Sequence, residues 1–155
     1  MKIFFFIPTL EKGGIERSLS RISRKLIDLG WDVTLLTNEL SLEGKSYFET
    51  SIKIIRVETP FENKKSLFFQ LLNNFLLFFK FRKIINSHKP KLVLAAKNFP
   101  LAILLKKFSK NNFKLILREA VNPHVAASIQ RNYISERIIL YIKKMLYPKS
   151  DRIIA

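Results

Sequence analysis

The chain has 155 residues, of which 28 are Lys or Arg and 12 are Asp or Glu, and it contains no Cys. This length predicts a single domain that buries a hydrophobic core, and a hydrophobic content of 48% excludes a disordered tail. The lack of cysteine excludes a disulfide scaffold, cysteine-bound zinc and thiol catalysis. The formal net charge of +16 favours an anionic partner, such as nucleic acid, acidic lipid headgroups or a phosphorylated substrate.

Two apolar stretches superficially resemble targeting or membrane segments. Residues 2–7 are apolar, but the run ends at Pro8 and charge resumes at Glu11 and Lys12 with no small-residue cleavage site. A strand buried on both faces explains this run better. Residues 67–81 are interrupted by four polar side chains, whereas a spanning helix needs roughly 18 residues with few such breaks. We therefore expect a cytoplasmic protein.

The first part of the chain alternates between strand and helix patterns. Apolar residues recur at spacings of four and three from Ile15 to Leu29, which predicts a core-facing helix, and Gly30 ends it. The other predicted segments here are strands at residues 2–7, 32–37 and 53–57, and loops at residues 8–14 and 38–51.

The same alternation continues to the end of the chain. Pro100 lies near the start of one predicted helix, where proline is tolerated, and Ser135 caps another. The predicted segments are helices at residues 64–87, 100–109 and 135–146, strands at residues 91–96, 113–117 and 151–155, and an irregular stretch at residues 118–131. Six strands joined by crossovers predict one Rossmann-like α/β domain over residues 1–155, a three-layer, doubly wound parallel sheet.

The loop before the first helix is the expected binding site, because Gly13 and Gly14 stand there side by side. Ligands of open α/β sheets bind at the carboxyl ends of the strands, near the switch point beside the first strand. A Gly-Gly pair lets backbone N–H groups meet a phosphate or sugar with no Cβ in the way, or it only permits a tight turn. The nucleotide-binding patterns G-x-G-x-x-G and G-x-x-x-x-G-K-[ST] are both absent.

Three segments together resemble a known family. They are Pro-Thr-Leu at residues 8–10, Gly-Gly-Ile-Glu-Arg at residues 13–17 and Gly-Trp-Asp-Val at residues 30–33. In this order they are similar to the start of family 4 glycosyltransferases, which are retaining enzymes of the two-domain GT-B fold. Residues 150–155 resemble the last strand of the N-terminal domain in that family. The resemblance covers the whole chain but only the acceptor-side half of such an enzyme.

The resemblance implies transfer of a sugar from a nucleotide-sugar to a glycan or lipid-linked acceptor with retention, as in cell-envelope polysaccharide or lipopolysaccharide biosynthesis. The nucleotide-sugar site belongs to a C-terminal domain with no counterpart here, so this domain alone is expected to bind no cofactor and to be inactive. The residues implied are Gly13, Gly14, Glu16, Arg17 and Arg118 for substrate binding, and Glu119, Asn122 and His124 for catalysis. With no Cys and one His in this cleft, no metal site is expected.

Each of these side chains also has a plainer interpretation. Arg118 can form an ion pair with Glu119, and His124 can simply be solvated. Glu16 can complement the dipole in the first turn of its helix. Arg17 recurs with Arg21 and Arg24 at helical spacing opposite the apolar stripe, which is typical of a solvated face.

The positive charge leaves three alternatives open. The predicted helix at residues 64–87 is apolar around most of its circumference and carries five flanking Lys and Arg residues, so it either packs across the sheet or lies on an anionic membrane. If the helix lies on an anionic membrane, the protein is expected on the inner face of the cytoplasmic membrane. Nucleic-acid binding fits the charge, but it is disfavoured because the basic residues look scattered and no RNA- or DNA-binding motif is present. A non-catalytic remnant with an intact cleft is the third alternative.

Overall fold

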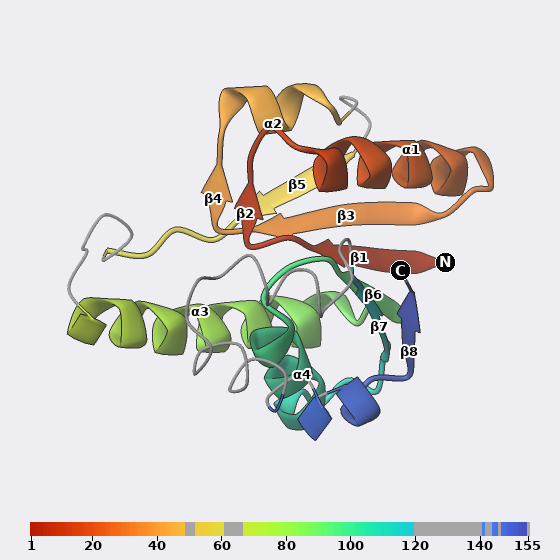
Figure 1. Ribbon diagram of the computed structural model, residues 1–155. Helices are drawn as coiled ribbons and strands as arrows, with labels where there is room; N and C mark the ends of the chain where they lie inside the picture. The colour runs from red at the N-terminus through yellow and green to blue at the C-terminus, as the bar shows by residue number, and fades with distance from the viewer. Residues whose placement is uncertain (49–51, 61–66, 120–140, 142–143, 146, 155) are drawn as a thin grey trace.

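The computed structural model describes residues 1–48, 52–60, 67–119, 141, 144–145 and 147–154. The main sheet consists of β1 (Lys2–Phe6), β3 (Asp32–Thr37), β5 (Lys53–Arg56), β6 (Leu92–Ala95), β7 (Lys114–Arg118) and β8 (Arg152–Ile154). Its strand order is β5-β3-β1-β6-β7-β8, and every neighbouring pair is parallel. The chain therefore winds outward from β1 in one direction and then from β6 in the other, which places the switch point between these two strands (Figure 1).

Helices cover both faces of this sheet. Helix α1 (Gly14–Asp28) lies on one face, and α3 (Leu67–His88) and α4 (Phe99–Phe108) lie on the other (Figure 1). Strand β1 supplies both cores because its side chains alternate between the faces. Ile3 and Phe5 pack with the α1 layer, whereas Phe4 and Phe6 pack with the α3–α4 layer. The predicted three-layer, Rossmann-like fold is confirmed.

The strand predictions and the helix predictions at residues 15–29, 64–87 and 100–109 are confirmed to within a few residues, and two loop predictions are wrong. Residues 8–14 contain β2 (Thr9–Leu10), and residues 38–51 contain β4 (Glu39–Leu40) and the short helix α2 (Leu42–Ser46). Strands β2 and β4 pair in parallel beyond β1 and β3. Gly44 of α2 lies against the backbone of β2, where a Cβ would come within 2.5 Å of the Leu10 carbonyl oxygen.

The remaining segments are only partly comparable with the predictions. A short 3-10 helix, η1 (Tyr147–Lys149), precedes β8. The helix expected at residues 135–146 lies largely outside the described residues, and so does most of the irregular stretch expected at residues 118–131. Within the part of the chain that the structure describes, no helix is both long and apolar enough to cross a membrane.

Asp151, just before β8, adds side-chain hydrogen bonds to the pairing of β8 with β7. One carboxylate oxygen of Asp151 accepts a hydrogen bond from the backbone N–H of Leu115 at 2.6 Å and another from the ammonium group of Lys106. Burial alone would raise the pKa of Asp151, but these two hydrogen bonds and the positive charges of Lys106 and Lys114 outweigh burial and lower it. The charged form of Asp151 is therefore favoured by folding.

We expect Asp151→Asn to lower the free energy of unfolding by about 1 kcal/mol at pH 7, a modest value because the side chain is 39% exposed. A carboxyl group with a lowered pKa contributes stability above its unfolded-state pKa and loses that contribution as the pH falls through its folded-state pKa. The difference between the two proteins should therefore shrink towards pH 3. Urea unfolding of both proteins at pH 7 and at pH 3 measures this difference in free energy. An equal difference at the two pH values would contradict a stabilising role for the charged Asp151 carboxylate.

Candidate active site

The loop between β2 and α1 is held by an ion pair between a buried carboxylate and a partly exposed lysine. Glu16 lies in the first turn of α1 and is only 2% exposed. Its Oε1 atom is 2.7 Å from Nζ of Lys97, the residue two positions after the end of β6. The same ammonium group donates a hydrogen bond to the carbonyl oxygen of Thr9 at 3.0 Å. Lys97 thus joins the chain after β1 to the chain after β6, across the switch point.

The two glycines of this loop have different surroundings. A Cβ on Gly13 would lie 2.7 Å from Oε2 of Glu16, so the missing side chain leaves room for the buried carboxylate. A Cβ on Gly14 would meet nothing within 4 Å. The backbone at Gly14 is therefore open to a ligand at the N-terminal end of α1, where N–H groups and the helix dipole favour anions.

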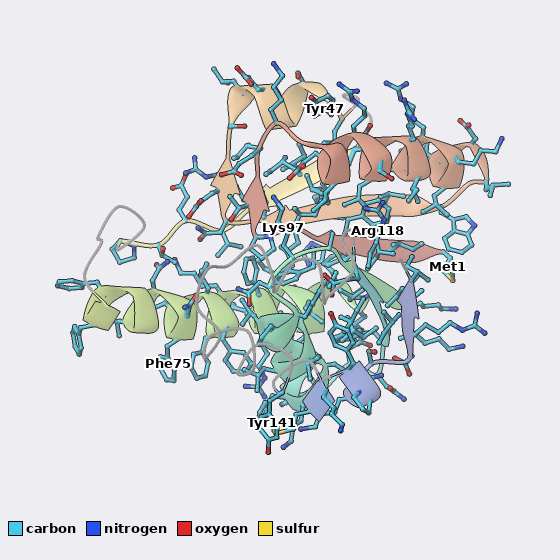
Figure 2. The ribbon with its side chains drawn as sticks, viewed as in Figure 1. Met1, Tyr47, Phe75, Lys97, Arg118 and Tyr141 are labelled. Atoms are coloured by element: carbon cyan, nitrogen blue, oxygen red, sulfur yellow. The ribbon has the colours of Figure 1, made fainter. Side chains whose placement is uncertain are left out.

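Arg118, the last residue of β7, extends towards the same helix (Figure 2). Its Nη2 atom donates a hydrogen bond to the hydroxyl oxygen of Ser18 at 2.8 Å. Its Nη1 atom is buried and has no hydrogen-bond partner among the described residues. Because Glu16 and Lys97 neutralise each other, the guanidinium of Arg118 adds positive charge beside the first turns of α1, where it contacts Ser18.

The other predicted site residues are oriented differently. Arg17 is exposed and its guanidinium lies 5.8 Å from the centre of the Tyr47 ring, next to α2. Glu119 accepts a hydrogen bond from the hydroxyl of Tyr147, and its backbone N–H donates to Ile154 of β8 at 2.8 Å. The structure thus brings Gly13, Gly14, Glu16 and Arg118 to one edge of the sheet. Their roles, and those of Arg17 and Glu119, stay predictions.

Asn122 and His124 lie outside the described residues, so their predicted catalytic roles also stay predictions. Among the residues that the structure describes, no three His, Asp or Glu side chains gather in a way that could hold a metal ion.

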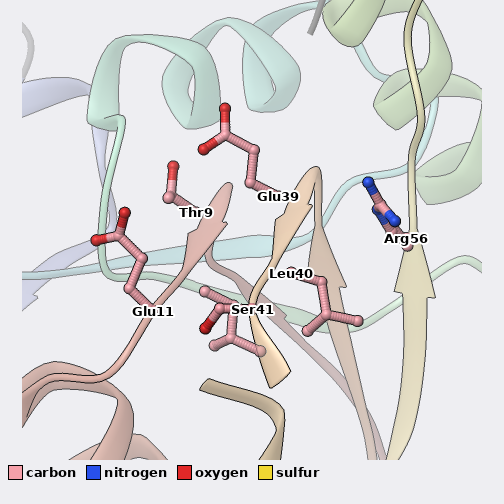
Figure 3. A pocket seen from close by; sticks show the side chains of 7 residues that line it. Thr9, Glu11, Glu39, Leu40, Ser41 and Arg56 are labelled. Atoms are coloured by element: carbon pink, nitrogen blue, oxygen red, sulfur yellow. The ribbon is translucent and has the colours of Figure 1, made fainter. Parts of the chain in front are cut away.

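A polar pocket adjoins this loop (Figure 3). Its volume is about 460 Å³, and its lining residues are Thr9, Leu10, Glu11, Glu39, Leu40, Ser41 and Arg56. Thr9 and Glu39 face each other in the parallel register of β2 and β4. Thr9 links the pocket to the ion pair, because its carbonyl oxygen accepts the hydrogen bond from Lys97. Two carboxylates, two hydroxyls and one guanidinium offer many hydrogen-bonding groups to a polyhydroxylated ligand.

Sequence reasoning missed Lys97 and the pocket residues Glu39 and Arg56. Lys97 carried a usable signal, since it directly follows a predicted strand and the carboxyl ends of parallel strands share one edge. Glu39 also follows a predicted strand, but the pairing of β2 with β4 that sets it beside Thr9 was not predicted, and Arg56 lies inside the strand predicted at residues 53–57.

The model of the family described as Glycosyltransferase Family 4 matches residues 12–155, which include all of α1 and its N-terminal glycines. The chain belongs to glycosyltransferase family 4. The sequence resemblance is thereby confirmed. No curated protein matches the chain.

Solved structures share this glycosyltransferase fold at low sequence identity. Anabaena Alr3699/HepE, in complex with UDP and glucose, matches with a TM-score of 0.66 and 18% identity over 100% of this chain and 38% of its own. The lipopolysaccharide outer core galactosyltransferase WaaB matches with a TM-score of 0.57 and 15% identity over 76% of this chain and 32% of its own. An alpha-glucosyltransferase in complex with UDP and DNA matches with a TM-score of 0.54 and 17% identity over 98% of this chain and 34% of its own.

The three matches cover 76% to 100% of this chain but only a minor part of each solved structure. The chain spans between 32% and 38% of the length of these three structures. At such identities they show the GT-B glycosyltransferase fold alone.

Proposed function

We propose that this chain is the acceptor-side half of a retaining glycosyltransferase that moves a sugar from a nucleotide-sugar to a glycan or lipid-linked acceptor. The match of the family model to residues 12–155 carries this proposal. The nucleotide-sugar donor would be held mainly by a second domain outside these 155 residues. HepE, crystallised with UDP and glucose, supports a donor of this type.

The loop at Gly14 would face the diphosphate of the donor. Negative charge develops on that diphosphate as the bond to the sugar breaks, and donors already in position stabilise it most effectively. The open backbone at Gly14 and the guanidinium of Arg118 are such donors. The ion pair of Glu16 with Lys97 keeps a carboxylate from repelling the phosphates, because the lysine neutralises it.

The polar pocket would bind the acceptor. The carboxylates of Glu11 and Glu39 lie with the hydroxyl of Thr9 on one side of the β2–β4 pair, and Arg56 stands beside them on β5 (Figure 3). Sugar hydroxyls donate to carboxylates and accept from guanidinium groups, so a glycan fits this lining. The pocket adjoins the loop that would face the donor, since Thr9 lines the pocket and also accepts the hydrogen bond from Lys97.

The proposal is tested with the native gene product, by measuring the transfer of radiolabelled sugar from UDP-, GDP- and ADP-linked donors to cell-envelope glycans and lipid extracts. We expect at least one donor to support transfer and the linkage to keep the donor's anomeric configuration, as read from the NMR spectrum of the product. A native protein that transfers from none of these donors, or that inverts the linkage, contradicts the proposal.

Substitution of the pocket carboxylates tests where the acceptor binds. We expect Glu11→Gln with Glu39→Gln to raise the acceptor KM about tenfold, because hydrogen bonds to charged groups contribute about 1.5–3 kcal/mol each and amides replace them in part. Asp28→Asn is the matched control, since Asp28 is an exposed acid at the far end of α1. An acceptor KM that is equal in the variant and the control would exclude this pocket.

A location on the inner face of the cytoplasmic membrane follows from the same proposal, because a lipid-linked acceptor is presented there. WaaB, a lipopolysaccharide outer core galactosyltransferase, supports an acceptor of the cell envelope.

A further inference from the structure

The positive charge of the chain is concentrated in one stretch, contrary to the scattered distribution first expected. Residues 63–118 contain 13 Lys or Arg and no Asp or Glu, whereas residues 1–62 contain nine of each sign. The basic stretch forms α3, β6, α4 and β7. It therefore supplies α3 and α4, the two long helices that cover the second face of the sheet in the described part of the chain (Figure 1).

Helix α3 in this layer is apolar on two opposite faces. Leu77, Phe81 and Ile85 follow each other at intervals of four and are buried against the sheet. Phe75 points away from the sheet on the outer side of the helix (Figure 2), and Phe75 and Phe79 are 59% and 46% exposed. A helix that is apolar all round is normally buried on every side. The outer face of α3 is instead exposed, and no described residue of this chain covers it.

The outer side of α4 continues this apolar surface. Leu104 and Phe108 are 44% and 49% exposed. The rings form a continuous row, since Phe78 lies 5.2 Å from Phe79 and 6.0 Å from Phe108, measured between ring centres. A hollow of about 430 Å³ lies between the two helices and is lined almost entirely by apolar side chains. We call Phe75, Phe79, Leu104 and Phe108 the α3–α4 face.

Basic side chains border the α3–α4 face. Lys83 is exposed on α3, and Lys107 is exposed on α4. The ammonium group of Lys107 lies 5.5 Å from the centre of the Phe108 ring. Arg82 joins the two helices by donating a hydrogen bond to the Phe108 carbonyl oxygen at 2.7 Å. Aromatic rings flanked by long cations are the composition of segments that lie in the interface of an anionic bilayer.

We propose that the α3–α4 face binds the surface of an anionic lipid bilayer, with its four apolar side chains in the interface and Lys83 and Lys107 on lipid phosphates. That this bilayer is the cytoplasmic membrane rests on the proposed function, whereas lipid binding by the α3–α4 face does not require sugar transfer. Charge complementarity favours a bilayer over a second copy of the chain. Two copies meeting here would place lysines against lysines, because residues 63–118 hold no acidic partner.

The position of this face suits a lipid-linked acceptor. The hollow between the helices is lined by Asn98, which caps the start of α4 and directly follows Lys97 of the candidate site. The bilayer would therefore lie next to the carboxyl edge of the sheet. An acceptor anchored in that bilayer would reach the sugar-binding edge without leaving the membrane.

The test measures co-sedimentation of the full chain with phosphatidylcholine vesicles, with and without phosphatidylglycerol, in the absence of any sugar donor. We expect binding only when phosphatidylglycerol is present. Phe75→Ser with Phe79→Ser should weaken it about tenfold or more, and Lys83→Gln with Lys107→Gln about tenfold. The matched controls are Leu29→Ser with Leu42→Ser for exposed apolar residues, and Arg21→Gln with Lys25→Gln for charge on α1.

Three results would overturn the proposal. The first is binding that is absent, or that is reduced as much by the controls as by the variants of the face. The second is tighter binding to a mixed-sequence DNA duplex than to the vesicles, lost in the same variants. The third is a dimer in light scattering that Phe75→Ser with Phe79→Ser dissociates. The lysine variants keep the test decisive if the phenylalanine variants unfold, and loss of sugar transfer without loss of vesicle binding would implicate the proposed function alone.

Discussion

Replacing Lys97 by methionine is expected to lower the free energy of unfolding by about 3 kcal/mol, because it leaves the carboxylate of Glu16 buried without its cation. For a chain of this size that loss corresponds to a fall in Tm of roughly 6–12 °C. Glu16→Gln should cost less, about 1–2 kcal/mol, since Lys97 is 28% exposed and its ammonium group can turn towards solvent. Urea and thermal unfolding followed by circular dichroism measure both changes.

A double-mutant cycle separates the ion pair from general packing. Glu16→Gln combined with Lys97→Met should be more stable than the sum of the single changes predicts, with a coupling energy of about 1–2 kcal/mol. The pair of Lys12 with Glu43 is the matched control, because both side chains are 67% exposed and their atoms are 3.6 Å apart. The equivalent changes there should each cost less than about 0.5 kcal/mol. Additive losses at Glu16 and Lys97 would show that the pair does not hold the loop.

The sheet could be predicted from the sequence because its strands are buried on both faces. Such strands form uninterrupted apolar runs, as at Ile3 to Phe6, and local runs of this kind are visible without knowing what they contact. Helix α1 was equally visible because it buries one stripe of side chains. Both patterns depend only on residues close together in the sequence.

The candidate site could be predicted only in part because it is assembled from distant segments. The glycine pair marked the loop, but Lys97 pairs with Glu16 across 81 positions of the chain. Strands β2 and β4 contain two residues each, too few for any alternation to appear. Gly44 could have indicated that this segment packs against β2, since a glycine often marks a place where another backbone approaches closely.

The two adjacent glycines have different surroundings in the structure, although the sequence analysis treated them as one feature. Gly13 gives space to the carboxylate of Glu16, so its substitution acts on the fold. Gly14 has open space around it, so its substitution acts on whatever approaches from outside. Neither has the positive φ that would itself require glycine.

Gly14→Val is therefore expected to leave the free energy of unfolding within about 0.5 kcal/mol of the native value while lowering the rate of sugar transfer about tenfold or more. Gly13→Ala should instead destabilise the chain by about 1–2 kcal/mol, because its methyl group displaces Oε2 of Glu16. Adding Glu16→Ala should remove that clash, so the double variant should lose little beyond Glu16→Ala alone. Urea unfolding and transfer by the native gene product give the two measurements.

Comparing Gly14→Val with Gly13→Ala distinguishes a loop that binds a ligand from a loop that only forms a tight turn. If the glycines served only the turn, both substitutions would change stability and transfer together, in proportion to the fraction unfolded. If the loop receives the donor, transfer by Gly14→Val falls while its fold persists. Normal transfer by a stably folded Gly14→Val protein would mean that no ligand approaches the start of α1. The donor would then have to be bound without this loop, for example through the guanidinium of Arg118.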